Sequence, residues 1–150
     1  MPSRLARSRV LTLTARAALA PYLVALALIV WLPADQAGRV TGVVAAAARL
    51  LVPLGVPFDV GYTVLEFLAN VALFVPFGAL LVWSWPRLRP WHVLLLGLGT
   101  SVVIELVQFA IPSRFPTLSD VVANGTGALV GAVLARLLTR AAPAHTIPGR

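Results

Sequence analysis

Four long apolar stretches, separated by short polar or proline-containing segments, dominate the pattern of hydrophobic and polar positions along the chain. They cover residues 11–32, 67–85, 91–111 and 120–138. A helix that crosses a bilayer needs about 20 mostly apolar residues, because each residue adds about 1.5 Å to its length. The pattern therefore predicts an all-α, polytopic membrane helical bundle with four transmembrane helices.

A fifth apolar run, residues 40–54, is less suited to crossing a membrane. Arg49 lies within it, Gly42 and Pro53 interrupt it, and further glycine and proline residues follow. A charged side chain near the centre of a bilayer is costly, whereas the apolar residues of this run fall on one face of a helix. That arrangement is typical of a helix that lies along the membrane surface. We therefore predict an interfacial helix over about residues 40–54.

The two ends of the chain differ in composition from its apolar centre. Residues 1–16 contain several arginines and predict a basic cytoplasmic leader. Residues 17–139 form the predicted transmembrane domain, and residues 66–138 carry its motifs. Residues 140–150 contain proline and glycine, and we expect them to form a disordered cytoplasmic tail.

Composition supports a membrane protein and changes the interpretation of its charge. Of the 150 residues, 59% are hydrophobic and 11% are charged, and the net charge is +7. A basic chain of this kind could bind nucleic acid. Here the arginines flank the predicted spans, where they would meet anionic lipid headgroups. We therefore expect membrane lipids as partners, and no nucleic acid.

The placement of the arginines also predicts an orientation. With four spans, the leader, the turn at residues 86–90 and the C-terminal end share one side of the membrane, and only Arg39, Arg49 and Arg114 fall on the other. An excess of basic residues marks the cytoplasmic side. We therefore predict a multi-pass protein of the cell membrane with both termini in the cytoplasm.

Polar and small residues recur at helical spacing in the last three spans. At the start of the second span these residues are Glu66 and Asn70, and one of those in the third span is Ser101. Steps of three and four residues place each set on one helical face, and these faces should meet inside the bundle because lipid offers them no hydrogen-bond partner. The topology places them within about 10 Å of the outer surface. The sequence thus predicts an outward-facing polar cluster, formed by Asn70, Glu105, Gln108, Arg114, Ser119, Asp120 and Asn124.

Each of these residues also has a purely structural interpretation. Asp120 is the last residue of a capping-box sequence and can simply close the N-terminus of the fourth helix. Arg114 can form an ion pair with Glu105 or with Asp120, and a Glu105 without such a partner can be protonated. The carboxamides can form interhelical hydrogen bonds. Gly127 and Gly131, one turn apart, favour close helix packing over a ligand site.

The same positions resemble the VanZ-like family of small integral membrane proteins. The residues that carry the resemblance are spaced as Asn70-x-x-Leu-Phe74-Val-Pro76-Phe-Gly78, then Glu105-x-x-Gln108-x-x-x-Pro112-x-Arg114 and Ser119-Asp120-x-x-x-Asn124-x-x-Gly127-x-x-x-Gly131. They cover about half of the chain. The resemblance implies a multi-span protein, and the member that gives the family its name is associated with teicoplanin resistance. It implies no biochemical mechanism.

These observations leave three functions open. The first is a cell-envelope protein whose polar cluster binds a lipid headgroup, a cell-wall precursor or a lipoglycopeptide, which the resemblance connects with antibiotic resistance. The second is a membrane-embedded acid/base enzyme that acts on a lipid-linked substrate with Glu105 and Asp120. The third is a structural subunit of an envelope complex.

Residues suited to catalysis or metal binding are few. The chain has no cysteine, and its two histidines, His92 and His145, lie away from the predicted outer end. Sequence motifs of serine hydrolases, zinc proteases and phosphate-binding loops do not occur. We therefore assign no catalytic residue, no metal ligand and no cofactor, and we expect binding rather than catalysis. The sequence does not predict an oligomeric state.

Overall fold

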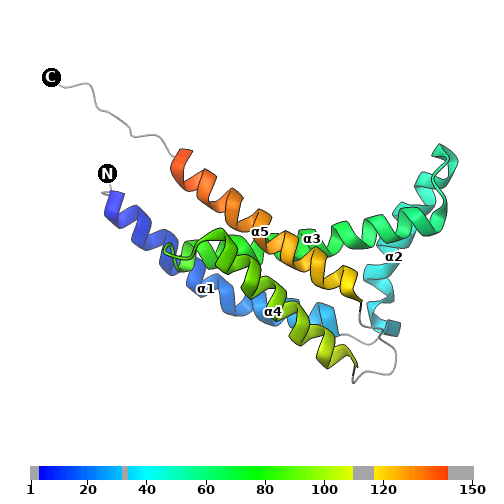
Figure 1. Ribbon diagram of the computed structural model, residues 1–150, viewed down its shortest axis with the longest axis horizontal. Helices are drawn as coiled ribbons and strands as arrows, with labels where there is room; N and C mark the ends of the chain where they lie inside the picture. The colour runs from blue at the N-terminus through cyan, green and yellow to red at the C-terminus, as the bar shows by residue number, and fades with distance from the viewer. Residues whose placement is uncertain (1–3, 32–33, 110–116, 142–150) are drawn as a thin grey trace.

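The structure of this chain is a computed structural model that describes residues 4–31, 34–109 and 117–141. Side chains are described for residues 8–31, 42–109 and 117–141. Over these ranges the secondary structure is helical, and the described residues form no strand. Figure 1 shows the arrangement of the helices.

The helices follow one another in the chain with short connections. In order they are α1 (Arg4–Trp31), α2 (Ala34–Leu51), a 3-10 helix η1 (Val52–Leu54), α3 (Phe58–Ser84), α4 (Pro90–Phe109) and α5 (Leu118–Ala141). Within the described residues, α1, α3, α4 and α5 are long and apolar enough to cross a membrane, whereas the apolar part of α2 is shorter. The prediction of an all-α bundle with four membrane-spanning helices and one shorter helix is therefore confirmed.

Several helix boundaries differ from the sequence prediction. α1 begins at Arg4, within the predicted leader, rather than at residue 11, and α2 begins at Ala34 rather than at residue 40. α3 begins at Phe58 rather than at residue 67, so the second span is preceded by two further turns of helix that contain polar residues. Asp59 lies in the first turn of α3, where a negative charge complements the helix dipole. α5 continues to Ala141, so the start of the predicted tail is helical. The remainder of that tail, residues 142–150, lies outside the described residues.

The shorter helix and the start of α3 form an antiparallel hairpin. Gly55 closes the turn between them with a φ of 88°, a left-handed conformation that glycine adopts without strain. Ala48 of α2 is fully buried, while the guanidinium of Arg49 is exposed and lies 5.9 Å from the ring centroid of Phe58. This hairpin projects away from the other helices (Figure 1). The location of α2 in the membrane interface stays a prediction.

α3 lies at the centre of the bundle and packs against α5 almost backbone to backbone. A Cβ atom at Gly78 of α3 would collide with the carbonyl group of Ala128 of α5, so only glycine permits this distance between the helices. Phe74 of α3 and Ala132 of α5 are both fully buried and belong to the same hydrophobic core. On its other side, α3 is joined to α1 by the hydroxyl of Tyr22, which donates to the carbonyl oxygen of Leu73 at 2.6 Å.

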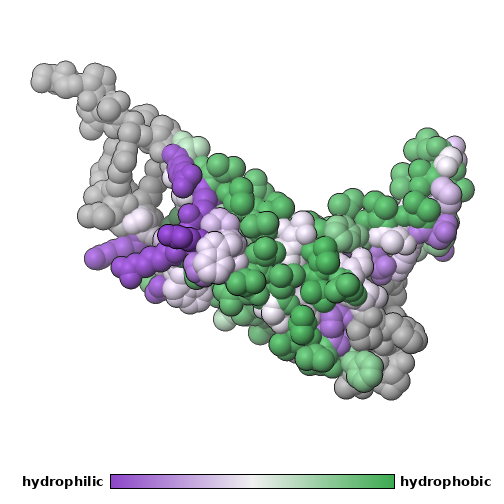
Figure 2. Space-filling model, viewed as in Figure 1, coloured by the Kyte–Doolittle hydropathy of each residue, from purple (hydrophilic) through white to green (hydrophobic). Residues whose placement is uncertain are grey.

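One end of the bundle carries the described arginines of α1, α5 and the turn between α3 and α4. There Arg16 of α1 donates to the carbonyl oxygen of Ser84 at 3.2 Å, and its guanidinium lies 5.8 Å from the ring centroid of Trp85. Arg136 of α5 donates to the carbonyl oxygen of Leu88. Figure 2 shows hydrophilic residues gathered at this end and a hydrophobic surface over the middle of the helices. We call this end, with Arg9, Arg16, Arg87, Arg89, Arg136 and Arg140, the basic end.

Candidate functional site

At the other end of α5, two side chains satisfy backbone groups of its first turn. The hydroxyl oxygen of Thr117 accepts a hydrogen bond from the backbone N–H of Asp120 at 3.1 Å. The N–H of Thr117 itself donates to Oε2 of Glu105 in α4, at 3.0 Å. In a capping box the residue in the position of Asp120 would accept this second bond. Here Glu105, from the preceding helix, takes that role.

Asp120 consequently binds a different partner, on α3. The side-chain amide of Asn70 donates to Oδ1 of Asp120 at 2.6 Å. Both side chains are half-buried, and the carboxylate lies in the first turn of α5, where the helix dipole favours negative charge. Within the described residues, no hydrogen bond reaches the second oxygen, Oδ2. Asp120 is therefore held in place through one oxygen and can accept a hydrogen bond through the other.

One turn deeper, a buried hydrogen bond joins α4 and α5. The side-chain amide of Asn124 donates to the hydroxyl oxygen of Ser101 at 2.8 Å, with Asn124 4% exposed and Ser101 fully buried. The described residues provide no hydrogen-bond partner for Oδ1 of Asn124, although this atom is buried. This pair fits the structural interpretation of the carboxamides, since interhelical hydrogen bonds of this kind stabilise membrane bundles.

Gln108 faces α1 rather than α5. Its side-chain amide donates to the carbonyl oxygen of Val30 at 2.7 Å. Val30 lies in the last turn of α1, where backbone carbonyl groups have no partner within their own helix. Gln108 therefore satisfies the C-terminal end of α1.

The structure brings together part of the predicted cluster. Asn70, Glu105 and Asp120, from three different helices, meet around Thr117, and we call these four residues the polar site. Asn124 lies one helical turn below Asp120 and contacts Ser101 instead. Arg114 lies outside the described residues.

Two further polar residues point elsewhere. Ser119 is exposed. Glu66 is also exposed and accepts a hydrogen bond from the hydroxyl of Tyr62 at 3.4 Å, so the prediction that it faces the bundle interior is wrong. The reason is its position in the first part of α3, which pairs with α2 and projects away from the other helices (Figure 1).

Gly127 and Gly131 lie where α5 approaches α3 most closely. A Cβ atom at Gly127 would collide with the carbonyl group of Val71, and one at Gly131 with that of Val75. Both glycines are buried. Their position allows the two backbones to touch and leaves no room for a ligand at this level of the bundle.

Sequence reasoning missed the role of Thr117 in this site. Thr117 belongs to the capping sequence, which indicates where α5 begins, but nothing in the local pattern shows that its N–H binds a side chain of α4. In chemical terms the polar site offers carboxylate and carboxamide oxygens and a half-buried negative charge. Among the described residues, no group of three or more His, Cys, Asp and Glu side chains is placed to hold a metal ion.

Comparison with known protein families supports the sequence resemblance. Residues 19–139 match the family described as VanZ/LLP1, a range that covers most of the chain and contains the whole polar site. The curated proteins and the solved structures gave no match. The chain is therefore a multi-pass membrane protein that belongs to the VanZ/LLP1 family.

Proposed function

We propose that this protein binds a ligand rich in hydroxyl or amine groups at the polar site. The observation that carries the proposal is the half-buried carboxylate of Asp120, which Asn70 orients through Oδ1 at 2.6 Å, while none of the described residues donates a hydrogen bond to Oδ2. A charged acceptor forms stronger hydrogen bonds than a neutral one, and a carboxylate that is already held loses little freedom on binding.

The position of the site supports a ligand on the outer side of the cell membrane. The arginines of the basic end lie at the opposite end of α5 from Asp120, and an excess of basic residues favours the cytoplasmic side. The polar site would then face outward, with both chain termini in the cytoplasm. Three ligand classes present hydroxyl or amine groups there: lipid headgroups, lipid-linked cell-wall precursors and lipoglycopeptides.

Binding accounts for the contacts of the site better than acid/base catalysis does. Catalysis on a lipid-linked substrate needs a nucleophile or activated water within reach of a carboxyl group. Glu105 instead accepts the backbone N–H of Thr117, and the nearby serine hydroxyl of Ser101 accepts from Asn124. These contacts hold side chains in fixed positions, as a binding site requires.

The experiment is a binding titration of the purified full chain in lipid nanodiscs. Teicoplanin, a lipid-linked peptidoglycan precursor and a glycolipid serve as probes, one for each ligand class. Asp120→Asn keeps the shape and removes the charge, and it should weaken binding of at least one probe about tenfold, because a hydrogen bond to a charged group contributes about 1.5–3 kcal/mol.

Asp59→Asn is the matched control. It makes the same change at an exposed carboxylate in the first turn of α3, away from the polar site, and should leave the affinity unchanged. Equal affinities of the Asp120→Asn variant and the unaltered protein for every probe would contradict the proposal. So would the same loss of affinity in both variants.

A further inference from the structure

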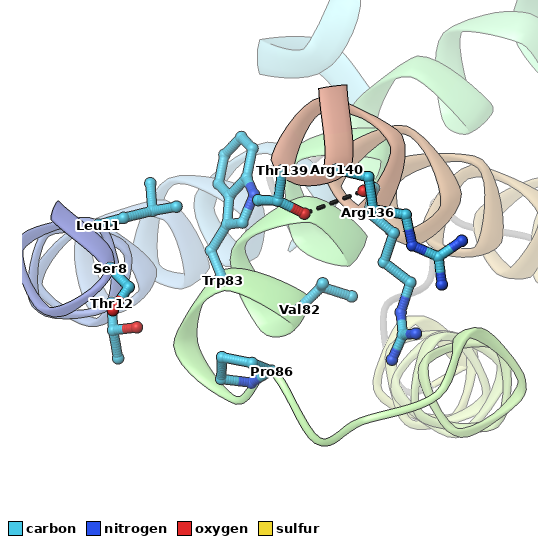
Figure 3. Close-up of a pocket in the computed structure, with 9 residues that line it drawn as sticks. All are labelled: Ser8, Leu11, Thr12, Val82, Trp83, Pro86, Arg136, Thr139 and Arg140. Atoms are coloured by element: carbon cyan, nitrogen blue, oxygen red, sulfur yellow. Dashed lines mark hydrogen bonds between the residues drawn. The ribbon is translucent and has the colours of Figure 1, made fainter. Parts of the chain in front are cut away.

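A pocket of about 280 Å³ lies at the basic end, between the first turns of α1 and the last turns of α3 and α5. Leu11 and Thr12 of α1 form one side, Arg136 and Arg140 of α5 form the other, and Trp83 of α3 lies between them (Figure 3). Its position separates it from the polar site, which lies at the opposite end of α5.

Two hydrogen-bond donors of this pocket are buried without a partner in the described part of the chain. They are the indole Nε1 of Trp83 and Nε of Arg136. Arg136 uses another nitrogen of its guanidinium to bind the carbonyl oxygen of Leu88, which holds the side chain in place. Buried donors are normally paired, so these two atoms indicate a missing acceptor.

The charges around the pocket show which kind of acceptor fits. All five acidic side chains of the protein lie elsewhere in the sequence, at Asp35, Asp59, Glu66, Glu105 and Asp120. The basic end consists of the first half of α1, the first half of α4 and the last turns of α3 and α5, and none of the five acidic side chains belongs to these segments. The arginines there have no acidic side chain nearby to neutralise them, so an anion from outside the protein would do so.

We propose that this pocket binds the phosphate group of an anionic membrane lipid. Arginine binds phosphate through two parallel N–H groups, and both Arg136 and Arg140 line the pocket. A volume of about 280 Å³ is at the lower limit of ligand pockets, so it suits a headgroup rather than a whole lipid. The proposal is independent of the function proposed for the polar site.

A lipid fits the surroundings better than a soluble phosphate compound does. Leu11 and Val82 give the pocket an apolar side, and Leu137 and Leu138, which follow Arg136 in α5, are 54% and 64% exposed. These side chains would contact the acyl chains while the arginines bind the headgroup. Trp83 suits the same boundary, since tryptophan prefers the level of the headgroups.

The experiment measures lipid binding to the detergent-purified full chain by native mass spectrometry. Phosphatidylglycerol is titrated against phosphatidylcholine with the same acyl chains. The unaltered protein should bind phosphatidylglycerol at least about tenfold more tightly, and Arg140→Gln should remove most of that preference. Leu11→Trp, which fills the pocket without changing the charge, should do the same.

Arg87→Gln is the matched control, because Arg87 is an exposed arginine of the basic end that does not line the pocket. It should change the affinity by less than about twofold. Equal losses in the Arg87→Gln and Arg140→Gln variants would indicate diffuse attraction to the basic end and overturn the proposal. Unchanged binding in the Leu11→Trp variant would overturn it as well.

Competition with glycerol 3-phosphate distinguishes the two sources of phosphate. This compound has the headgroup chemistry and no acyl chains, so it should not displace phosphatidylglycerol at equal concentration. Displacement at equal concentration would identify the ligand as a soluble phosphate compound and refute the assignment to a lipid. Circular dichroism and size-exclusion chromatography verify that each variant is folded.

Discussion

Oε2 of Glu105 accepts a hydrogen bond from the backbone N–H of Thr117 at 3.0 Å, so a side chain of α4 closes the N-terminus of α5. The contact joins two consecutive helices at the level of the polar site. It also takes over the role that Asp120 would have in a capping box, which leaves the carboxylate of Asp120 to bind Asn70 of α3. Together the two hydrogen bonds connect three helices.

Glu105→Gln should preserve this cap, because the carbonyl oxygen of glutamine can accept the same hydrogen bond. We expect normal accumulation in the membrane and weaker ligand binding. Glu105→Ala removes the acceptor and should lower the free energy of unfolding by about 0.5–2 kcal/mol, the usual contribution of an N-cap. Unfolding by titration with a denaturing detergent compares the two variants. Equal stability of both would show that the cap contributes nothing, and unchanged binding by the glutamine variant would make Glu105 purely structural.

The bond between Asn70 and Asp120 should appear as a coupling in a double-mutant cycle. Alanine at each position, alone and together, measures how much the pair contributes beyond its separate side chains. Interhelical hydrogen bonds in membranes average about 0.6 kcal/mol and reach about 1.7, and we expect the upper part of this range because the acceptor is charged. Additive effects on the free energy of unfolding would contradict the observed bond.

Gly131→Ala should destabilise the packing of α5 on α3. The added methyl group would collide with the backbone at Val75, and relief requires the helices to separate, which costs about 1–3 kcal/mol in a packed core. Gly99→Ala is the matched control, since nothing lies within 4 Å of a Cβ atom at this exposed position of α4. It should be neutral or stabilise the helix by up to about 1 kcal/mol. Equal unfolding curves for the two variants would refute the close approach.

The predicted orientation can be tested by labelling single cysteines in intact cells, because the natural chain has none. Ser3→Cys and Ala144→Cys should resist an impermeant reagent, since both termini are expected in the cytoplasm. Asp59→Cys, on the same side of the predicted membrane as the polar site, should react. Labelling at either terminus would reverse the orientation and with it the outward-facing polar site.

The sequence by itself determined the class of fold and most of the spans. Apolar stretches of about 20 residues predict membrane helices because hydrophobicity and helical rise are local properties. The order of the spans also predicted that Asn70, Glu105 and Asp120 lie at the same level of the bundle, and they meet there in the structure. The boundaries were less certain, since the polar residues at the start of α3 lower its hydrophobicity without ending the helix.

Only the tertiary structure decided which polar groups bind one another. Gln108 shares a helical face with Glu105, yet it binds Val30 of α1 because α1 packs beside this part of α4. Thr117 binds Glu105 through a backbone N–H, which every residue but proline carries, so no side-chain pattern could single it out. The pocket at the basic end combines helix ends that are far apart in the chain. Hydrophobic periodicity specifies how each helix faces the bundle, whereas pairwise contacts depend on how the helices pack, and that information is not local.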